Sequence, residues 1–108
     1  MDILEKAFEL IELYDLYQAL LTEKQKKYFE SYYFDNYSIT EISENLDVSR
    51  NAVHDQLKKT VIKLNDYEQK LNFKVLENER IEIINKLLEI SKEEEVILLL
   101  TKLKKVEW

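Results

Sequence analysis

Polar and basic side chains concentrate in residues 49–64, at spacings that would place them on one exposed face of a helix. Four basic residues stand there against one acid, a local charge of +3 in a chain with a formal net charge of −6. Such a helix has the residue types that contact nucleic acids. The candidate DNA-contacting residues are Ser49, Arg50, Asn51, His54, Asp55, Lys58 and Lys59.

These side chains divide by the chemistry they offer. Arg50 and Asn51 carry the paired hydrogen-bonding groups that suit base edges in the major groove. Ser49, Lys58 and Lys59 suit phosphate oxygens. His54, the only histidine, would contact a base or a phosphate, and protonation would strengthen a phosphate contact. An ordinary solvated helix position explains His54 equally well.

The element that must position these residues is predicted to be the second helix of a helix-turn-helix at 38–64. A small residue, Ser43, stands where the two helices would cross. Asp47 holds the turn position usually given to glycine, and aspartate is among the few residues that adopt the left-handed conformation at modest cost. Val48 would fill the corner, and Val53 would be the buried branched residue of the second helix.

Helical periodicity extends over the rest of the chain. Glycine, proline and cysteine are all absent, which favours helices with polar connections and excludes glycine-rich phosphate loops and disulfides. Three capping-box patterns predict helix starts, at Thr22–Gln25, Ser38–Glu41 and Ser91–Glu94. We therefore predict an all-α protein of five or six helices, a single helical domain over 1–108, with C-terminal helices at about 73–106.

Two further groups of apolar side chains have alternative interpretations. Tyr28, Phe29 and Tyr32 are spaced for a core rather than for base stacking, which leaves Phe34 and Tyr37 exposed for a protein contact. The apolar residues of the C-terminal helices exceed what a DNA-binding unit needs. We expect a homodimer to bury them, with packing on the broad apolar face of the first helix as the alternative.

The larger part of the chain, about 14–72, resembles region 4 of sigma factors in layout and, more closely, the YlxM family of bacterial helix-turn-helix proteins. The resemblance is carried by Leu21-Thr22, Lys24-Gln25, Tyr32-Tyr33, Asp35, Tyr37-Ser38, Glu41-Ile42, Val48-Ser49-Arg50, Ala52-Val53, Asp55, Lys58, Tyr67-Glu68 and Lys70-Leu71. It implies a small, dimeric, cytoplasmic protein whose gene lies beside those of the signal recognition particle GTPases. His54 departs from the family, where an aromatic residue is expected.

Two functions follow from these expectations. The first is a regulatory protein that binds duplex DNA through the helix at 49–64. The second is an accessory protein that contacts the signal recognition particle protein or its RNA. A single histidine without cysteine does not make a zinc site, and we expect no metal, no cofactor and no enzymatic activity. Acids recur along the first sixteen residues, so we expect neither a signal peptide nor membrane insertion, and a cytoplasmic location.

Overall fold

The structure, a computed structural model, contains helices and no strands over the residues that it describes. These are residues 3–106, with side chains described from residue 5. They form six α-helices, which agrees with the prediction of five or six, and one short 3-10 helix that was not predicted. The chain divides into two compact units, Met1–Leu71 and Asn72–Trp108, and each is described by itself. The expectation of a single domain over 1–108 therefore stays a prediction.

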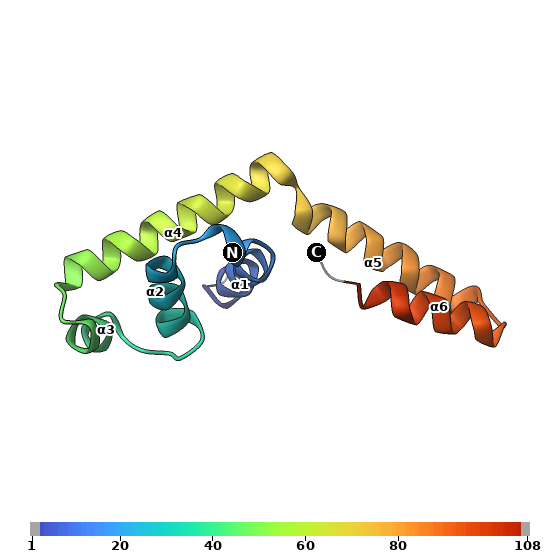
Figure 1. The fold of residues 1–108 in the computed structure, drawn as a ribbon, viewed down its shortest axis with the longest axis horizontal. Helices are drawn as coiled ribbons and strands as arrows, with labels where there is room; N and C mark the ends of the chain where they lie inside the picture. Colours follow the sequence, from blue (N-terminus) through green and yellow to red (C-terminus); the bar gives the residue numbers. More distant parts are fainter. Residues whose placement is uncertain (1–2, 107–108) are drawn as a thin grey trace. The chain divides into compact units, whose positions relative to one another are not determined.

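The first unit is organised around one long helix. Its elements are α1 (Ile3–Tyr17), η1 (Gln18–Leu20), α2 (Glu23–Tyr33), α3 (Ile39–Leu46) and α4 (Arg50–Leu71). Helices α1, α2 and α3 each pack against α4, and in Figure 1 all three lie on the same side of it. One flank of α4 is thus buried along most of its length, and the opposite flank is left to solvent.

Side-chain caps determine where these helices begin. The Thr22 hydroxyl accepts from the Gln25 amide at 3.1 Å, and the Gln25 side chain accepts in return from the Thr22 amide. Ser38 and Glu41 form the same reciprocal pair at the start of α3. Each box satisfies backbone N–H groups that the first helical turn leaves without partners. Both predicted helix starts are confirmed.

The buried face of α4 follows helical spacing. Val53, Leu57, Thr60 and Leu64 are buried, at intervals of four, three and four residues. Thr60 is fully buried, and its hydroxyl donates to the Gln56 carbonyl at 2.8 Å, which satisfies the polar group within the helix. These side chains pack with the buried residues of α1, α2 and α3, which are Leu10, Leu13, Tyr14, Tyr17, Tyr28, Phe29, Ile42 and Ser43.

Aromatic rings of α1 and α2 make up much of this core. The rings of Tyr14 and Phe29 stack in parallel with their centroids 4.5 Å apart, and Phe29 stacks on Tyr33 at 4.4 Å. Tyr28 and Phe29 are buried as predicted. The prediction for Tyr32 was wrong: it lies at the edge of the packed face of α2 and keeps 38% of its surface exposed.

The second unit is a pair of helices, α5 (Phe73–Ile90) and α6 (Glu94–Lys104), that pack side by side and run in opposite directions (Figure 1). The predicted capping box at Ser91 was wrong. The Ser91 amide donates to the Leu87 carbonyl and closes the end of α5, so α6 begins later, with Glu93 at its N-cap and no side-chain cap bond.

Most apolar side chains of this unit remain exposed. Only Ile84 and Leu100 are buried among its described hydrophobic residues. The exposed ones are Val75, Leu76, Ile83, Leu87, Ile90, Val96, Ile97, Leu98, Leu99, Leu103 and Val106. Even so, none of the helices between residues 3 and 106 is long and apolar enough to cross a membrane.

Candidate nucleic-acid interface

The turn between α3 and α4 depends on one residue in the left-handed conformation. Asp47 has φ 54° and ψ 49°, and its amide donates to the Glu44 carbonyl at 3.4 Å. The next amide, that of Val48, donates to the Ser43 carbonyl at 3.0 Å. These bonds satisfy the carbonyls at the end of α3 and reverse the chain within three residues, Asp47 to Ser49. The predicted role of Asp47 is confirmed.

A compact apolar corner holds the two helices together. Tyr28, Ile42, Val53 and Leu57 form a buried cluster, and the partly buried Ile39, Leu46 and Val48 pack against it. Ser43 is also buried where α3 meets α4, and its hydroxyl donates to the Thr40 carbonyl at 2.7 Å. The sequence assigned Ser43, Val48 and Val53 to this corner, and the structure places all three there.

Ser49 begins α4. Its hydroxyl oxygen accepts from the Ala52 amide at 3.0 Å, the bond that an N-cap side chain makes. This bond uses the oxygen as an acceptor and leaves the hydroxyl hydrogen free to donate. Ser49 thus sits at the positive end of the helix dipole with a donor for an anion.

All seven candidate contact residues are exposed in the structure. They follow the turn directly and occupy the first three turns of α4, on flanks that do not pack against α1, α2 or α3. Val53 and Leu57, the buried residues between them, fix the rotation of the helix. The core therefore presents the whole set to solvent together, and the DNA-contacting roles of all seven residues stay predictions.

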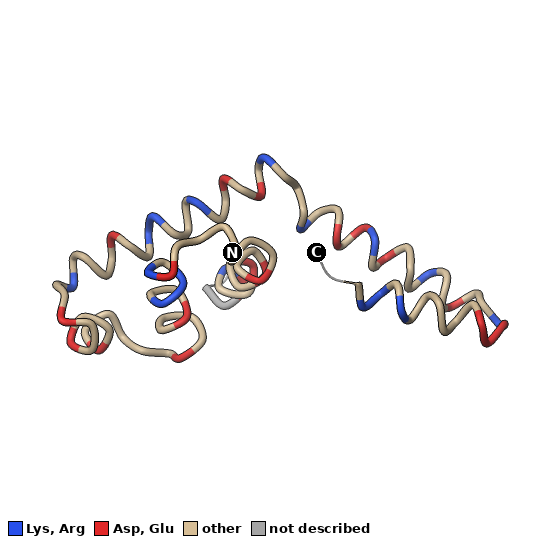
Figure 2. Tube along the Cα trace, in the orientation of Figure 1, with Lys and Arg blue, Asp and Glu red and all other residues tan. Residues whose placement is uncertain are grey.

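The basic residues of this surface differ in their pairing. Lys59 forms an ion pair with Asp55, with Nζ and Oδ2 2.9 Å apart. Arg50 and Lys58 have no ion pair with any residue that the structure describes. Figure 2 shows that acids interrupt the basic positions along α4. The free positive charge of the surface is therefore carried by Arg50 and Lys58.

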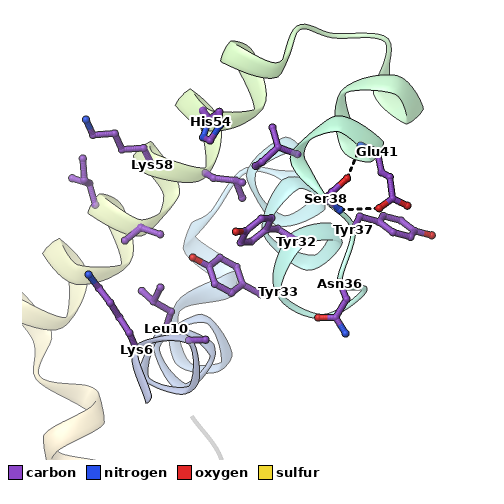
Figure 3. Close-up of a pocket in the computed structure, with 15 residues that line it drawn as sticks. Lys6, Leu10, Tyr32, Tyr33, Asn36, Tyr37, Ser38, Glu41, His54 and Lys58 are labelled. Atoms are coloured by element: carbon purple, nitrogen blue, oxygen red, sulfur yellow. Dashed lines mark hydrogen bonds between the residues drawn. The ribbon is translucent and has the colours of Figure 1, made fainter. Parts of the chain in front are cut away.

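A groove that was not predicted opens beside this surface. It has a volume of about 830 Å³ and is bounded by α1, the end of α2, the start of α3 and α4. His54 and Lys58 line it, so both belong to the groove and to the exposed surface (Figure 3). Lys6 lines it from α1 and was not predicted, because its position near α4 depends on tertiary packing between residues about fifty apart.

Tyrosine side chains form one wall of the groove. Tyr32 and Tyr33 project into it from α2 (Figure 3). Burial raises the pKa of the Tyr33 hydroxyl above its ordinary value, and the neighbouring Tyr32 adds to the shift. The Tyr33 group is therefore a neutral hydrogen-bond donor at physiological pH. Among the described residues there is no cluster of three or more histidine, cysteine or carboxylate side chains that would hold a metal ion.

The fold and the turn together define a helix-turn-helix protein. Comparison with known proteins agrees: residues 4–105 match the UPF0122 family, whose description is "Putative helix-turn-helix protein, YlxM / p13 like". The UPF0122 protein YlxM of Bacillus subtilis is 44% identical over 108 residues, which cover 96% of this chain and 98% of that protein.

Two further relatives lead to the same family. A UPF0122 protein of Halalkalibacterium halodurans is 46% identical over 87 residues, 81% of this chain and 80% of its own length. A UPF0122 protein of Bacillus velezensis is 43% identical over 108 residues, 96% of this chain and 98% of its own length. The chain belongs to the UPF0122 family, and the resemblance to YlxM drawn from the sequence is confirmed.

Proposed function

We propose that this protein is a regulator that binds duplex DNA by inserting the first turns of α4 into the major groove. The observation that carries the proposal is the α3–α4 turn. Asp47 in the left-handed conformation and the buried Val53 together project the exposed face of α4 away from the core. An exposed helix that follows such a turn has the dimensions and the freedom to enter the major groove.

In this proposal each side chain keeps the role its chemistry suggests. Arg50 and Asn51 read base edges, and Ser49, Lys58 and Lys59 contact phosphates. His54 and Asp55 lie between these groups on the same face of α4, where they modify the strength of the neighbouring base and phosphate contacts. Asp55 also holds Lys59 at 2.9 Å, so full engagement of Lys59 with a phosphate requires that this ion pair opens.

The test is binding of the full chain to labelled duplex DNA at increasing salt concentration. Each neutralised phosphate contributes roughly 0.9 to the slope of log K against log salt. Two phosphate-contacting lysines predict a slope of about −1 per α4 helix while Lys59 stays with Asp55, and about −2 if it is released. Absence of binding at low salt would refute the proposal.

The exposed apolar surface of α5 and α6 supports a homodimer as the form that binds DNA. Eleven large hydrophobic side chains are exposed among the 35 described residues of this unit. Monomeric proteins rarely expose so large an apolar surface, and a dimer interface would bury it. A two-fold dimer would carry two copies of α4, which suits palindromic half-sites about one helical turn of DNA apart.

The dimer has its own measurement, analytical ultracentrifugation of the full chain. Leu98→Lys, at a side chain 65% exposed on α6, is expected to shift the sedimentation toward the monomer. Phe8→Lys, at a similarly exposed site on α1, is the matched control and should leave the dimer intact. A monomeric unsubstituted protein, or equal loss from both variants, would refute an α5–α6 dimer.

The second candidate function is an accessory protein of the signal recognition particle pathway. One observation favours its protein-contacting form: Asp55 offsets Lys59 in the middle of the proposed DNA surface, and this weakens the attraction to a polyanion, whether DNA or RNA. The unoccupied apolar side chains of α5 and α6 would then contact a protein. Pull-down experiments with the purified particle protein and its RNA, beside the DNA titration, distinguish the two functions.

A further inference from the structure

The groove between α1 and α4 has the size of a small-molecule site. Its volume of about 830 Å³ falls within the range of roughly 300–1,000 Å³ that ligand pockets usually occupy. The side chains of Leu10 and Leu57, both largely buried, contribute to its lining, and so does Val61. Such a lining favours a ligand with an apolar body.

The aromatic wall is held in place before any ligand arrives. The Tyr33 ring is stacked on the fully buried Phe29 with centroids 4.4 Å apart. Tyr32 meets Tyr33 edge to face at 5.0 Å. The two ring planes stand 78° apart, so the rings form a corner whose walls can pack against the face and the edge of a planar aromatic ligand. Because the rings are already fixed, this contact costs little entropy.

The positive charge of the groove favours a negatively charged ligand. Lys6 and Lys58 line it from α1 and α4, and neither forms an ion pair with another described residue. In Figure 3 their ammonium groups and the hydroxyls of Tyr32 and Tyr33 all point to the left of the view. These groups offer hydrogen-bond donors and positive charge on one side of the groove.

The one carboxylate in the lining does not cancel this charge. Glu41 already accepts from the Ser38 amide at 3.2 Å in the capping box of α3, which directs it toward the helix terminus (Figure 3). His54 adds a further donor beside Lys58 on α4. The polar part of the groove is therefore basic, although the whole chain is acidic.

We propose that this groove binds a small planar organic anion, with its ring against Tyr32 and Tyr33 and its acidic group near Lys6 and Lys58. Such an occupant would also cover His54 and Lys58 on α4 and would compete with duplex DNA. This competition rests on the proposed function. The ligand site itself does not, and the experiment below contains no DNA, so either proposal can fail without the other.

The experiment is an NMR titration of the isotope-labelled full chain with 1-anilinonaphthalene-8-sulfonate, a planar aromatic sulfonate. The expected result is saturable binding with the largest shifts at Lys6, Ala7, Tyr32, Tyr33, His54 and Lys58. Shifts confined to the exposed apolar side chains of α5 and α6, or shifts that do not saturate, would overturn the proposal. N-phenyl-1-naphthylamine lacks the sulfonate, and equal binding of this neutral analogue would overturn the anion selectivity.

Two variants localise the binding. Ala7→Trp fills the groove from α1 and is expected to weaken binding about tenfold. Ala19→Trp, on the exposed η1 outside the groove, is its control. Lys6→Gln removes one charge at an exposed site without threatening the fold, and should weaken sulfonate binding about fivefold while Lys24→Gln on α2 does not. Unchanged binding in both groove variants would overturn the proposal.

Discussion

Asp55 and Lys59 form an ion pair, 2.9 Å apart and one helical turn from each other, in the middle of the exposed face of α4. Both side chains are more than half exposed, so solvent screens the pair and it adds little to the stability of the helix. Its effect on binding is larger, because Asp55 opposes a phosphate and competes for Lys59. The same spacing and distance recur at Asp66–Lys70, farther from the turn.

We expect Asp55→Asn to tighten binding to duplex DNA. The change removes a repulsive charge and frees Lys59, so affinity at low salt should rise about fivefold and the salt slope should steepen by about 1. Fluorescence anisotropy with labelled duplex across a salt series measures both quantities. Asp66→Asn is the matched control, and an equal gain from it would show that only the net charge of the chain matters.

The base-reading and phosphate-contacting roles predict different losses. Arg50→Ala and Asn51→Ala should each reduce discrimination between DNA sequences, by roughly 1–3 kcal/mol for a lost bidentate contact. Lys58→Ala should weaken binding to every sequence and reduce the salt slope by about 1. Competition binding with preferred and scrambled duplexes separates the two effects.

Lys70→Ala, at the far end of α4, is the control for a general loss of charge. If Arg50→Ala, Asn51→Ala and Lys58→Ala all reduce discrimination and affinity equally, the division of roles is wrong. If none of them changes binding, α4 is not the contact surface.

The parts of the fold that the sequence predicted are those that local interactions decide. The capping boxes at Thr22 and Ser38 act within three residues. The left-handed conformation of Asp47 is a preference of that one residue type. Ser91 and Glu94 have the same residue types as the Ser38–Glu41 pair but form no capping box, because the Ser91 amide already donates to the Leu87 carbonyl at the end of α5. A local pattern does not show which of two adjacent helices will use a residue.

The features that could not be predicted from the sequence depend on contacts between distant segments. The Tyr17 hydroxyl donates to the Glu68 carboxylate at 2.6 Å, across 51 residues, and the Tyr67 hydroxyl donates to the Leu20 carbonyl at 3.3 Å. These bonds join the end of α1 and η1 to the second half of α4. The groove beside Lys6 exists only because α1 is positioned in this way, and no spacing within one helix indicates it.

The conformation of Asp47 makes Asp47→Gly a stabilising substitution. Glycine adopts positive φ without the clash of a Cβ atom, and the gain is partly offset by the greater entropy of the unfolded chain. We expect the free energy of unfolding to rise by about 0.5 kcal/mol, whereas Asp47→Val should lower it by about 1–2 kcal/mol. Urea denaturation of the full chain measures both.

A second aspartate provides the control of opposite sign. Asp15 is exposed within α1, where glycine is a poorer helix former than aspartate, so Asp15→Gly should destabilise the protein by about 0.5 kcal/mol. A loss of stability from Asp47→Gly as well would contradict the argument from backbone conformation.

Ionisation of Tyr14 is expected to lower the stability of the protein at alkaline pH. Its hydroxyl is buried and makes no hydrogen bond with the residues that the structure describes. Burial raises the pKa of Tyr14 well above its ordinary value of 10.0, and the nearby Glu30 carboxylate raises it further. Because the folded state keeps this proton longer than the unfolded state, the contribution is constant below pH 10 and the stability falls above it.

Each pH unit above the ordinary pKa should lower the free energy of unfolding by about 1.4 kcal/mol through Tyr14. Tyr14→Phe should remove this slope, and at neutral pH it should leave the stability unchanged or raise it by up to about 1 kcal/mol. Urea denaturation at several pH values measures both effects, with Tyr37→Phe at an exposed ring as the control. A large loss at neutral pH would show that the Tyr14 hydroxyl has a partner.

Arg80 determines how firmly the last turn of α6 is held. Its guanidinium lies on α5 and donates to the Leu103 carbonyl at 2.6 Å and to the Val106 carbonyl at 3.0 Å, while Glu77 orients it. The Val106 amide also donates to the Leu103 carbonyl at 3.3 Å, and a cation is favourable at this end of the helix dipole. Arg80 therefore connects the end of α6 to α5 through the backbone.

We expect Arg80→Ala to accelerate hydrogen exchange of the Lys105 and Val106 amides several-fold, because the carbonyls around them lose their donors and the final turn frays. Exchange followed by NMR on the full chain measures this directly. Lys86→Ala, also on α5 but paired with Glu82 at 3.8 Å, should leave these amides unchanged. Arg80→Lys keeps the charge but loses the paired donors, so full protection in that variant would mean that charge alone holds the turn.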